Sequence, residues 1–323
     1  MDTFKLDIKT DKNLLAFSAG IDSTALFFMM LAQNIPFDIA IVDYQQRQQS
    51  KEEVIYATQL AHRYNKKCFI SQYPSDLKFS EKEARDYRHN FFHEIMINDQ
   101  YKALFTAHQL NDKLEWFLMQ LTKGAGLTEL IGMESLSYKE HYQIQKPLLS
   151  LSKKTLQNYL DENKIKYFID SSNYDEKYKR NYFRHNFSDE LIEKFESGIG
   201  KSFEYLENDN RSLLKEVVVS KNKELSTYDF NGDTNIALRI IDKELKQRGI
   251  IISNATREEI ATQKSLVVSH KIAITITENK IFIAPFISET MDKKFKERCR
   301  IAKIPINIRA YIYRLYQENL FIF

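Results

Sequence analysis

Short apolar runs alternate with segments of helical periodicity over the first part of the chain. Four runs have the composition of buried strands, at residues 14–17, 37–43, 67–71 and 103–107. Between the second and third runs, apolar residues recur at Val54, Ala57, Leu60 and Ala61, the spacing of an amphipathic helix. Strands that alternate with helices favour an α/β fold with a doubly wound parallel sheet, which binds ligands beyond the carboxyl ends of its strands.

The last third of the chain has a different pattern. Residues 202–219 are charged and have helical spacing, and residues 236–249 and 256–264 predict two more helices. Residues 273–284 alternate apolar and polar positions around a polar turn, which is typical of a β-hairpin. We therefore expect a smaller, mostly helical C-terminal domain with a β-hairpin. The expected divisions are 1–200, 201–290 and a basic tail at 291–323.

Composition limits the class of protein. The chain has 323 residues, 43% of them hydrophobic, which is enough for two domains. Cys68 and Cys299 form no CxxC motif, so we expect neither a zinc site nor a disulfide framework, and we expect a cytoplasmic location. No long apolar run predicts a membrane segment, and the sequence predicts no oligomeric state.

Positive charge is concentrated near the end of the chain. Residues 292–314 hold eight Lys or Arg against two acidic residues, on a chain whose formal net charge is +3. Such a basic segment is typical of contact with nucleic acid. A solvated tail with a purely structural role is the alternative.

The turn after the first predicted strand has the composition of an anion site. Its residues are Ser18, Ala19, Gly20, Ile21, Asp22 and Ser23. A strand, a turn of small residues and a helix direct unpaired backbone N–H groups at one point, where the helix dipole favours phosphate. The Asp22 carboxylate repels phosphate unless a cation such as Mg²⁺ lies between them. The turn contains no lysine and is not a Walker A loop; the alternative is an ordinary helix start capped by Asp22 or Ser23.

Polar clusters also follow the other predicted strands. Residues 43–50 form a polar loop, and Arg88 lies on a charged helix face; a solvated loop and a surface salt-bridge face are the alternatives. His108 follows the fourth strand, and Asp112 and Glu115 lie one turn apart at the next helix start. Carboxylates in a first turn serve either as caps or in metal and acid–base chemistry.

A later segment, residues 178–185, interleaves basic and aromatic side chains. It contains Arg180, Asn181 and Arg184. Guanidinium groups next to aromatic rings suit contacts with phosphates and bases. A charged helix with one aromatic face is the alternative.

Together, these motifs resemble those of the tRNA(Ile)-lysidine synthetases in their shorter form, a family of PP-loop ATP pyrophosphatases. SAGIDS is similar to the family's SGGxDS, and KPLLSLSKKTLQNYL to RPLLxxxRxxIxxYL. The two longest matches are TAHQLNDKLEWFLMQLTKGAGLTELIGM, similar to AHHxDDQxETxLxxLxRGxGLxGLxGM, and DSSNYDEKYKRNYFRHN, similar to DxSNxDxxYxRNxIRxxL. The resemblance covers about residues 14–190.

The resemblance implies an α/β adenine-nucleotide domain followed by a tRNA-binding domain. It implies a ligase that uses ATP, Mg²⁺ and L-lysine to convert the wobble cytidine of isoleucine tRNA with a CAU anticodon into lysidine. AMP and pyrophosphate would be released through an adenylated tRNA intermediate, and the codon read by the tRNA would change from AUG to AUA.

The family's functional residues can be assigned by motif position. Residues 18–23 would bind ATP, with Asp22 near the magnesium ion. The remaining assignments are His108, Asp112, Glu115 and Arg88 to catalysis and lysine binding, and Arg180, Asn181 and Arg184 to contact with the tRNA.

This chain departs from the family pattern at several positions, among them Asp43, Tyr44 and Lys113. Ala19 replaces a glycine, Gln109 replaces the second histidine, and Asn111 replaces the first aspartate of the DD pair. One alternative is therefore a tRNA-binding module with impaired catalysis. Another is a different PP-loop tRNA-modifying enzyme, such as a 2-thiolation enzyme, although these generally need a cysteine pair or an iron–sulfur site.

Overall fold

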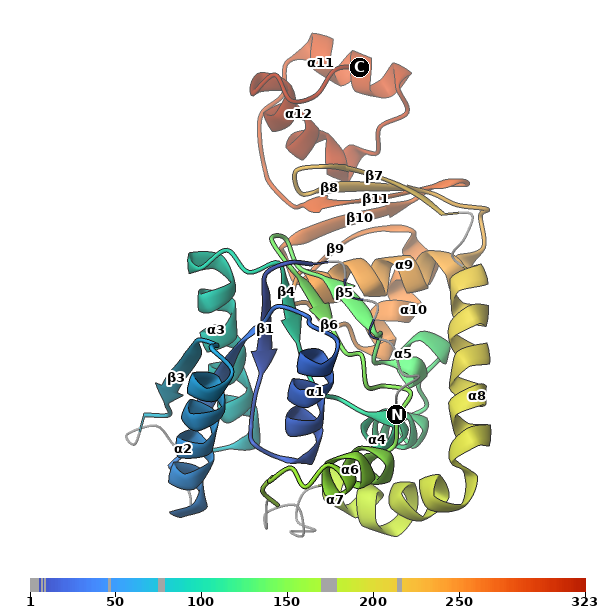
Figure 1. The fold of residues 1–323 in the computed structure, drawn as a ribbon. Helices are drawn as coiled ribbons and strands as arrows, with labels where there is room; N and C mark the ends of the chain where they lie inside the picture. The colour runs from blue at the N-terminus through green and yellow to red at the C-terminus, as the bar shows by residue number, and fades with distance from the viewer. Residues whose placement is uncertain are drawn as a thin grey trace. The chain divides into compact units, whose positions relative to one another are not determined.

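The computed structural model describes residues 6, 8, 10–45, 48–74, 79–169, 179–213 and 217–323. Arg47, in the polar loop of residues 43–50, and the first part of the DSSNYDEKYKRN motif, at residues 170–178, lie outside the described residues. The chain divides into two compact units, Met1–Leu206 and Glu207–Phe323 (Figure 1).

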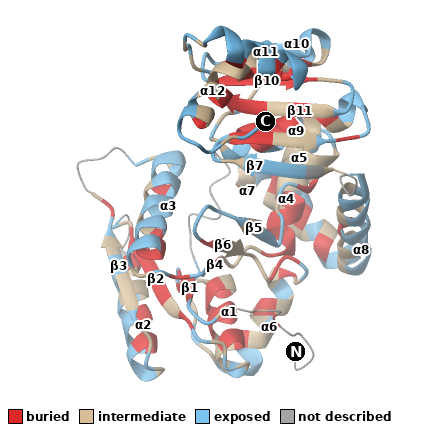
Figure 2. Cartoon of the chain, turned by 90° about the horizontal axis from the view of Figure 1, so that it is seen from above, coloured by how far each residue is buried: buried red, intermediate tan, exposed pale blue. Residues whose placement is uncertain are grey.

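The first unit contains a six-stranded sheet that is parallel except for one edge strand. Its strand order is β3 (Cys68–Gln72), β2 (Asp38–Asp43), β1 (Asn13–Ala16), β4 (Ala103–Phe105), β6 (Gln143–Gln145) and β5 (Leu136–Tyr138), of which β5 is antiparallel to β6. The four predicted strands are therefore confirmed, and β5 and β6 are additional. In Figure 2 the strands β1 and β2 are largely buried.

Helices cover both faces of this sheet because neighbouring residues of a strand point to opposite faces. Leu15 of β1 belongs to the core that the sheet shares with α1, α2 and α6, whereas Leu14 belongs to the core shared with α3. These helices are α1 (Ile21–Ala32), α2 (Gln48–Arg63), α3 (Glu81–Asn98) and α6 (Lys153–Glu162). The doubly wound α/β expectation is confirmed.

A helical region completes the first unit. It comprises α4 (Leu110–Leu121), α5 (Leu127–Ile131), α7 (Lys179–Phe183), the π-helix η2 (Arg184–Ser188) and α8 (Asp189–Leu213), of which residues 207–213 belong to the second unit. Helix α8 has non-helical backbone angles at Phe195, and it is largely exposed in Figure 2. The expected helix over residues 202–219 is wrong beyond Leu213, because Val218 begins a strand.

The second unit is a five-stranded antiparallel sheet with helices on both faces. The strand order is β7 (Val218–Asn222), β8 (Leu225–Asp229), β11 (Lys280–Pro285), β10 (Ile272–Ile276) and β9 (Ser265–Val268). The predicted hairpin is confirmed as β10 and β11, which pair antiparallel, whereas the other strands were not predicted.

Alternation along β10 separates the two cores of the second unit. Ile272, Ile274 and Ile276 pack with α9 (Thr234–Gln247) and α10 (Asn254–Gln263). Ala273 packs with the opposite layer, which consists of α11 (Lys293–Ile301), the 3₁₀ turn η3 (Ile306–Ile308) and α12 (Arg309–Gln317). The basic C-terminal segment is therefore a folded layer of this unit. Among the described residues, no helix is long and apolar enough to cross a bilayer.

Candidate active site at the carboxyl edge of the parallel sheet

The site lies where strands β1 and β4, neighbours in the sheet, both end. Strand β2, which follows β1 in the chain, lies on one side of β1 in the sheet, and β4 lies on the other side. Strand order reverses at such a point, which opens a crevice for ligands beyond the strand ends. The turn of residues 18–23 follows β1, and His108 follows β4.

The turn after β1 is held in a fixed shape by its own hydroxyl groups. The Ser18 backbone N–H donates to Ser23 Oγ at 3.1 Å, and the two serine hydroxyl oxygens are 3.1 Å apart. Ala19 has φ of +60°, a left-handed conformation that favours glycine, and its carbonyl accepts from the Phe168 N–H at 2.9 Å. The family's glycine is thus replaced by alanine without loss of the turn.

The N-terminus of α1 has no side-chain cap. Gly20 is the N-cap residue, and its position carries no side-chain cap hydrogen bond. Ser23, one of the two residues in the capping alternative, instead uses its hydroxyl to accept from Ser18. The first N–H groups of α1 therefore lack a side-chain acceptor at the cap, which is what an anion-binding helix start requires.

Asp22 is a buried carboxylate in an unfavourable setting. Within the described part of the chain, its Oδ1 is buried without a hydrogen-bond partner. Burial and the negative charge of Asp112 raise the pKa of Asp22 to about 7, against the lowering effect of Lys153 and Arg184. A carboxylate that resists ionisation in the protein alone would ionise readily with a cation beside it, so this position fits a magnesium ion.

Asp22 would hold such an ion with few other protein ligands. The described residues contain no group of three or more His, Cys, Asp or Glu side chains arranged to hold a metal. Magnesium is commonly bound by one or two carboxylates together with substrate phosphates and water. The donor set here therefore suits magnesium that arrives with a nucleotide.

The loop after β4 is fixed by a capping box at the start of α4. Gln109, the N-cap, accepts from the Asn111 N–H at 2.5 Å, and Asp112 Oδ2 accepts from the Gln109 N–H at 3.0 Å. The Asp112 side chain therefore serves as a helix cap, which was one of the two roles expected for a carboxylate in a first turn. Its other oxygen, Oδ1, accepts from Arg180 and faces the site.

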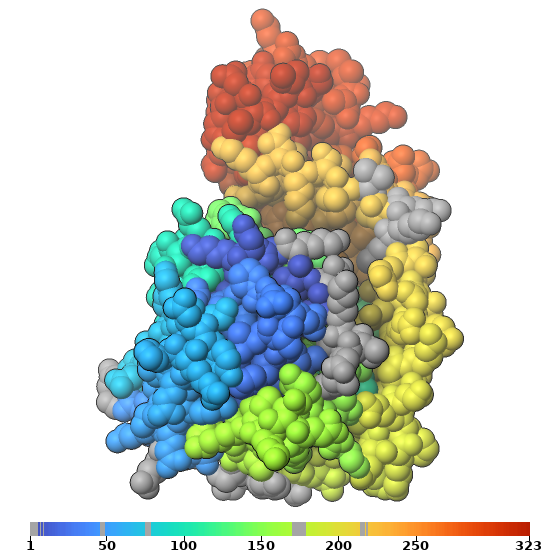
Figure 3. Space-filling model, in the orientation of Figure 1, coloured from blue at the N-terminus to red at the C-terminus, as the bar shows by residue number. Residues whose placement is uncertain are grey.

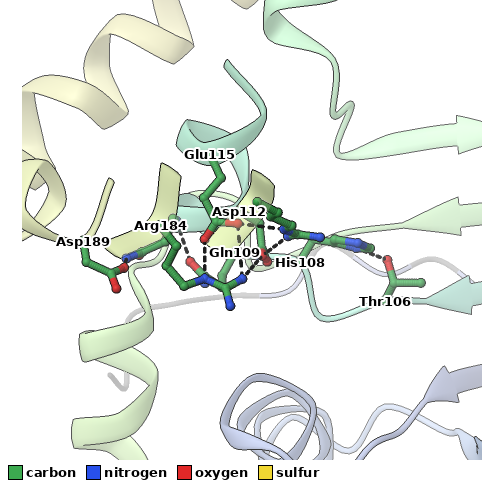
Figure 4. A network of polar contacts seen from close by, with 9 residues as sticks. Thr106, His108, Gln109, Asp112, Glu115, Arg184 and Asp189 are labelled. Atoms are coloured by element: carbon green, nitrogen blue, oxygen red, sulfur yellow. Dashed lines mark hydrogen bonds and ion pairs between the residues drawn. The ribbon is translucent and has the colours of Figure 1, made fainter. Parts of the chain in front are cut away.

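Asp112 and Glu115 form a network of ion pairs with Arg180 and Arg184 (Figure 4). Arg180 Nε donates to Glu115 Oε2 at 2.7 Å, and Arg184 Nε donates to Glu115 Oε1 at 2.7 Å. Glu115 is 0% exposed and Asp112 is also buried, and the two guanidinium groups balance the two carboxylate charges. Two sets of residues predicted from separate motifs are therefore in direct contact.

This network also controls how its members ionise. Burial raises the pKa of Asp112, but Arg180 and His108 lower it more, and the net value lies below the ordinary one. Asp112 is therefore charged at neutral pH. Burial lowers the pKa of His108 to about 4, so this imidazole is neutral, and its Nδ1 lies 3.0 Å from Thr106 Oγ1.

Arg88 and Asn181 occupy different surroundings. Arg88 is exposed on α3, hydrogen-bonds with Tyr44 and contributes to the lowered pKa of His108. Its charge therefore acts on the loop after β4. Asn181 is buried on α7, beside Arg180 in sequence.

Three side chains at this edge were not assigned a role from sequence. Asn111, noted as a departure from the family, donates to Asp189 Oδ1 at 2.9 Å and accepts from the Lys153 backbone N–H at 3.2 Å. Lys146 follows β6, and burial lowers its pKa. Lys153 is among the groups that act on Asp22. The KPLLSLSKK motif, which contains both lysines, was the available signal.

Comparisons with known proteins identify the relatives of this chain. The family model described as the PP-loop domain matches residues 2–191. A tRNA(Ile)-lysidine synthase of Campylobacter jejuni (strain RM1221) is 39% identical over 95% of this chain and 94% of its own length. Proteins of the same name from Wolinella succinogenes, 40% identical over 95% and 94%, and Helicobacter pylori (strain ATCC 700392 / 26695), 39% identical over 95% and 90%, are similarly related.

Proposed function

The chain belongs to the tRNA(Ile)-lysidine synthases of the PP-loop family, and we propose that it joins L-lysine to the wobble cytidine of isoleucine tRNA bearing a CAU anticodon. ATP is cleaved to AMP and pyrophosphate in the process. One observation carries the proposal at the level of chemistry: an uncapped helix start with a buried carboxylate, Asp22, lies at the same sheet edge as the network around Glu115.

In the first step, the C2 oxygen of the cytidine attacks the α-phosphorus of ATP and the bond to the β-phosphate breaks. The N–H groups of residues 18–23 and the Ser18 and Ser23 hydroxyls hold the phosphates. Asp22 would hold magnesium, which neutralises phosphate charge when bound. Adenylation is needed because the carbonyl oxygen of cytidine is otherwise a poor leaving group.

In the second step, the lysine ε-amine loses its proton, its nitrogen bonds to C2, and AMP leaves with the oxygen. Asp112 and Glu115 bind the incoming ammonium, and they can do so because Arg180, with a third of its side chain exposed, turns from them toward the adenylate phosphate. Arg184 stays on Glu115 and keeps its charge compensated. Neutral His108 is a candidate acceptor for the amine proton.

The cysteine residues argue against the thiolation alternative. Cys68 lies on β3 in the first unit and Cys299 on α11 in the second, and both are free thiols. Burial raises the pKa of the Cys68 thiol to about 11, which suppresses the thiolate needed for sulfur transfer.

Mass analysis of the anticodon nucleoside tests the proposal. The protein is incubated with an isoleucine tRNA transcript that carries CAU, with ATP and with lysine, and the tRNA is digested to nucleosides. We expect a product with the mass of cytidine plus lysine minus one water, dependent on both ATP and lysine. Unchanged cytidine with intact tRNA binding would instead support a binding module that lacks catalysis.

A further inference from the structure

The phosphate-binding turn after β1 lacks a cationic side chain of its own. In Walker A loops, a lysine within the turn reaches the phosphates. Here residues 18–23 provide backbone N–H groups, two hydroxyls and one carboxylate. Pyrophosphate departure concentrates negative charge, so a cation from elsewhere in the chain is expected near this turn.

Helix α6 lies against α1, the helix that follows this turn. Its core residues Leu156 and Leu160 share the buried cluster of Phe27 and Met30 on α1. The two helices pack directly on one another, as the neighbouring surfaces of the blue and light green segments in Figure 3 show. The first residue of α6 is Lys153.

The backbone of Lys153 is anchored to the start of α4. Ser152 caps α6, and its hydroxyl accepts from the Thr155 N–H at 3.2 Å. The Lys153 N–H donates to Asn111 Oδ1 at 3.2 Å, which ties this helix start to α4. The start of α6 is therefore anchored next to Asp112 at the start of α4.

The Lys153 ammonium is a half-buried charge that the described residues leave without a hydrogen bond or ion pair. Its neighbour Lys154 has a side chain that is 67% exposed and pairs with Glu193 at 3.0 Å. The charge of Lys153 also lowers the pKa of Asp22, against the effect of burial. Of these two adjacent lysines, Lys153 alone acts on the nucleotide site.

We propose that Lys153 binds the β- and γ-phosphates of ATP and remains on the pyrophosphate as it leaves. The inference rests on the proposed function, and it assigns to α6 the charge that a Walker lysine supplies from within its own turn. When the α–β bond breaks, the electron pair passes to the pyrophosphate oxygen, and the Lys153 ammonium stabilises that charge without giving up its proton.

Binding of ATP, AMP and magnesium pyrophosphate by calorimetry, without tRNA, tests the assignment. We expect Lys153→Met to weaken ATP and pyrophosphate binding about ten- to hundredfold and to leave AMP binding unchanged, because AMP has neither phosphate. Lys154→Met is the matched control and should bind all three normally. Lys153→Arg should restore most of the affinity. Equal affinities in wild type and Lys153→Met, or equal losses in both Met variants, would overturn the inference.

Amine labelling of the unmodified protein gives a second readout that requires no variant. Magnesium pyrophosphate should protect Lys153 from an amine-reactive reagent and leave Lys154 labelled. Lysidine formation without such protection would refute this inference alone. Protection of Lys153 in a protein that makes no lysidine would refute the proposed function alone.

Discussion

Among single residues, Asp22 combines an unfavourable environment with a position in the proposed phosphate-binding turn. Its Oδ1 is buried without a partner among the described residues, and its pKa is raised to about 7. We expect Asp22→Asn to slow adenylation of the tRNA by roughly a hundredfold or more, because one electrostatic contact to the departing charge is lost. Release of pyrophosphate in single turnover measures this. Near-normal turnover would remove Asp22 from the mechanism.

Thermal unfolding of wild type and Asp22→Asn at a series of pH values tests separately whether the pKa of Asp22 is raised. The pKa of Asp22 is about 7 in the folded protein and has its ordinary value of 3.8 in the unfolded chain. Between these two pH values, Asp22 is protonated in the folded protein but ionised in the unfolded chain. Stability without ligand should therefore fall as the pH rises through this interval, and Asp22→Asn should remove this part of the fall. Parallel melting curves for the two proteins would mean that the carboxyl titrates normally.

Glu115 is expected to matter both for stability and for the second half-reaction. A neutral amide cannot compensate Arg180 and Arg184, so Glu115→Gln should lower the free energy of unfolding by about 3 kcal/mol. It should still form adenylated tRNA but convert it slowly to lysidine, with weaker saturation by lysine. Quenched-flow separation of the two half-reactions measures this.

The conditions that rescue Glu115→Gln identify its role. Excess lysine should restore part of the rate if the loss is in binding, and raised pH should do so if the loss is in deprotonation. A variant that is less stable but modifies tRNA at the normal rate would leave Glu115 a structural role only. Failure to form the adenylate would move it to the ATP side of the site.

At the scale of elements, the close packing of the end of α5 against Trp116 of α4 depends on one glycine. Gly132 has φ of +58°, and a Cβ there would lie 1.8 Å from Trp116 Nε1, which donates to the Glu129 carbonyl at 2.8 Å. Gly132→Ala should therefore destabilise the protein by about 3 kcal/mol and displace the indole.

Gly124→Ala is the matched control for this prediction. Gly124 also has a left-handed φ, +73°, but nothing lies within 4 Å of its added Cβ. We expect a cost of about 1 kcal/mol, from the backbone alone. Urea unfolding compares the two, and because the chain has one tryptophan, its emission reports the displacement directly. Equal costs in both variants would exclude the steric account.

The elements that the sequence predicted are those with a strong local pattern. The strands β1, β2 and β4 are largely apolar and buried, so their burial is visible in composition, whereas the edge strand β3 is a short apolar run that is half-buried or exposed. Strands β5 and β6 have only three residues each and are half-buried or exposed, and they exist because β6 pairs with β4. Strand β7 pairs with β8 across a short turn and carries no apolar periodicity that separates it from the preceding helix.

The candidate site shows the same division. The turn after β1 is contiguous in sequence. Its motif therefore indicated both its position and the unusual presence of a carboxylate, Asp22, in an anion-binding turn. The pairing of Glu115 with Arg180 and Arg184 joins residues 65 and 69 positions apart, and no local pattern encodes it. The role of Asn111 was missed for the same reason, since its partners Asp189 and Lys153 lie on other helices.

For the molecule as a whole, the basic layer of the second unit offers charge for a large polyanion. Lys293, Lys294 and Lys296 are exposed on α11, whereas Arg298 hydrogen-bonds with Tyr316 at 3.2 Å. We expect neutralising the three lysines to weaken tRNA binding and to reduce the log–log salt slope by roughly 0.7–0.9 for each lost phosphate contact. Filter binding over a salt series measures the slope.

A control for this prediction uses lysines of the same unit that are already paired. Lys223 pairs with Glu318 at 2.7 Å, and Lys280 pairs with Asp229 at 2.5 Å. Neutralising both should change the slope less than neutralising the three on α11. Lysidine formation at saturating tRNA should persist if the α11 lysines only position the substrate. An unchanged slope would show that α11 does not touch the tRNA.

The long sequence separation within the Glu115 network also determines when the site can exist during translation. Until Arg180 and Arg184 have left the ribosome, packing of α4 would bury Glu115 without a counterion, at a cost of several kcal/mol. We expect ribosome-stalled chains to resist proteolysis around α4 only once residue 184 has cleared the exit tunnel. Protection at shorter lengths would contradict this.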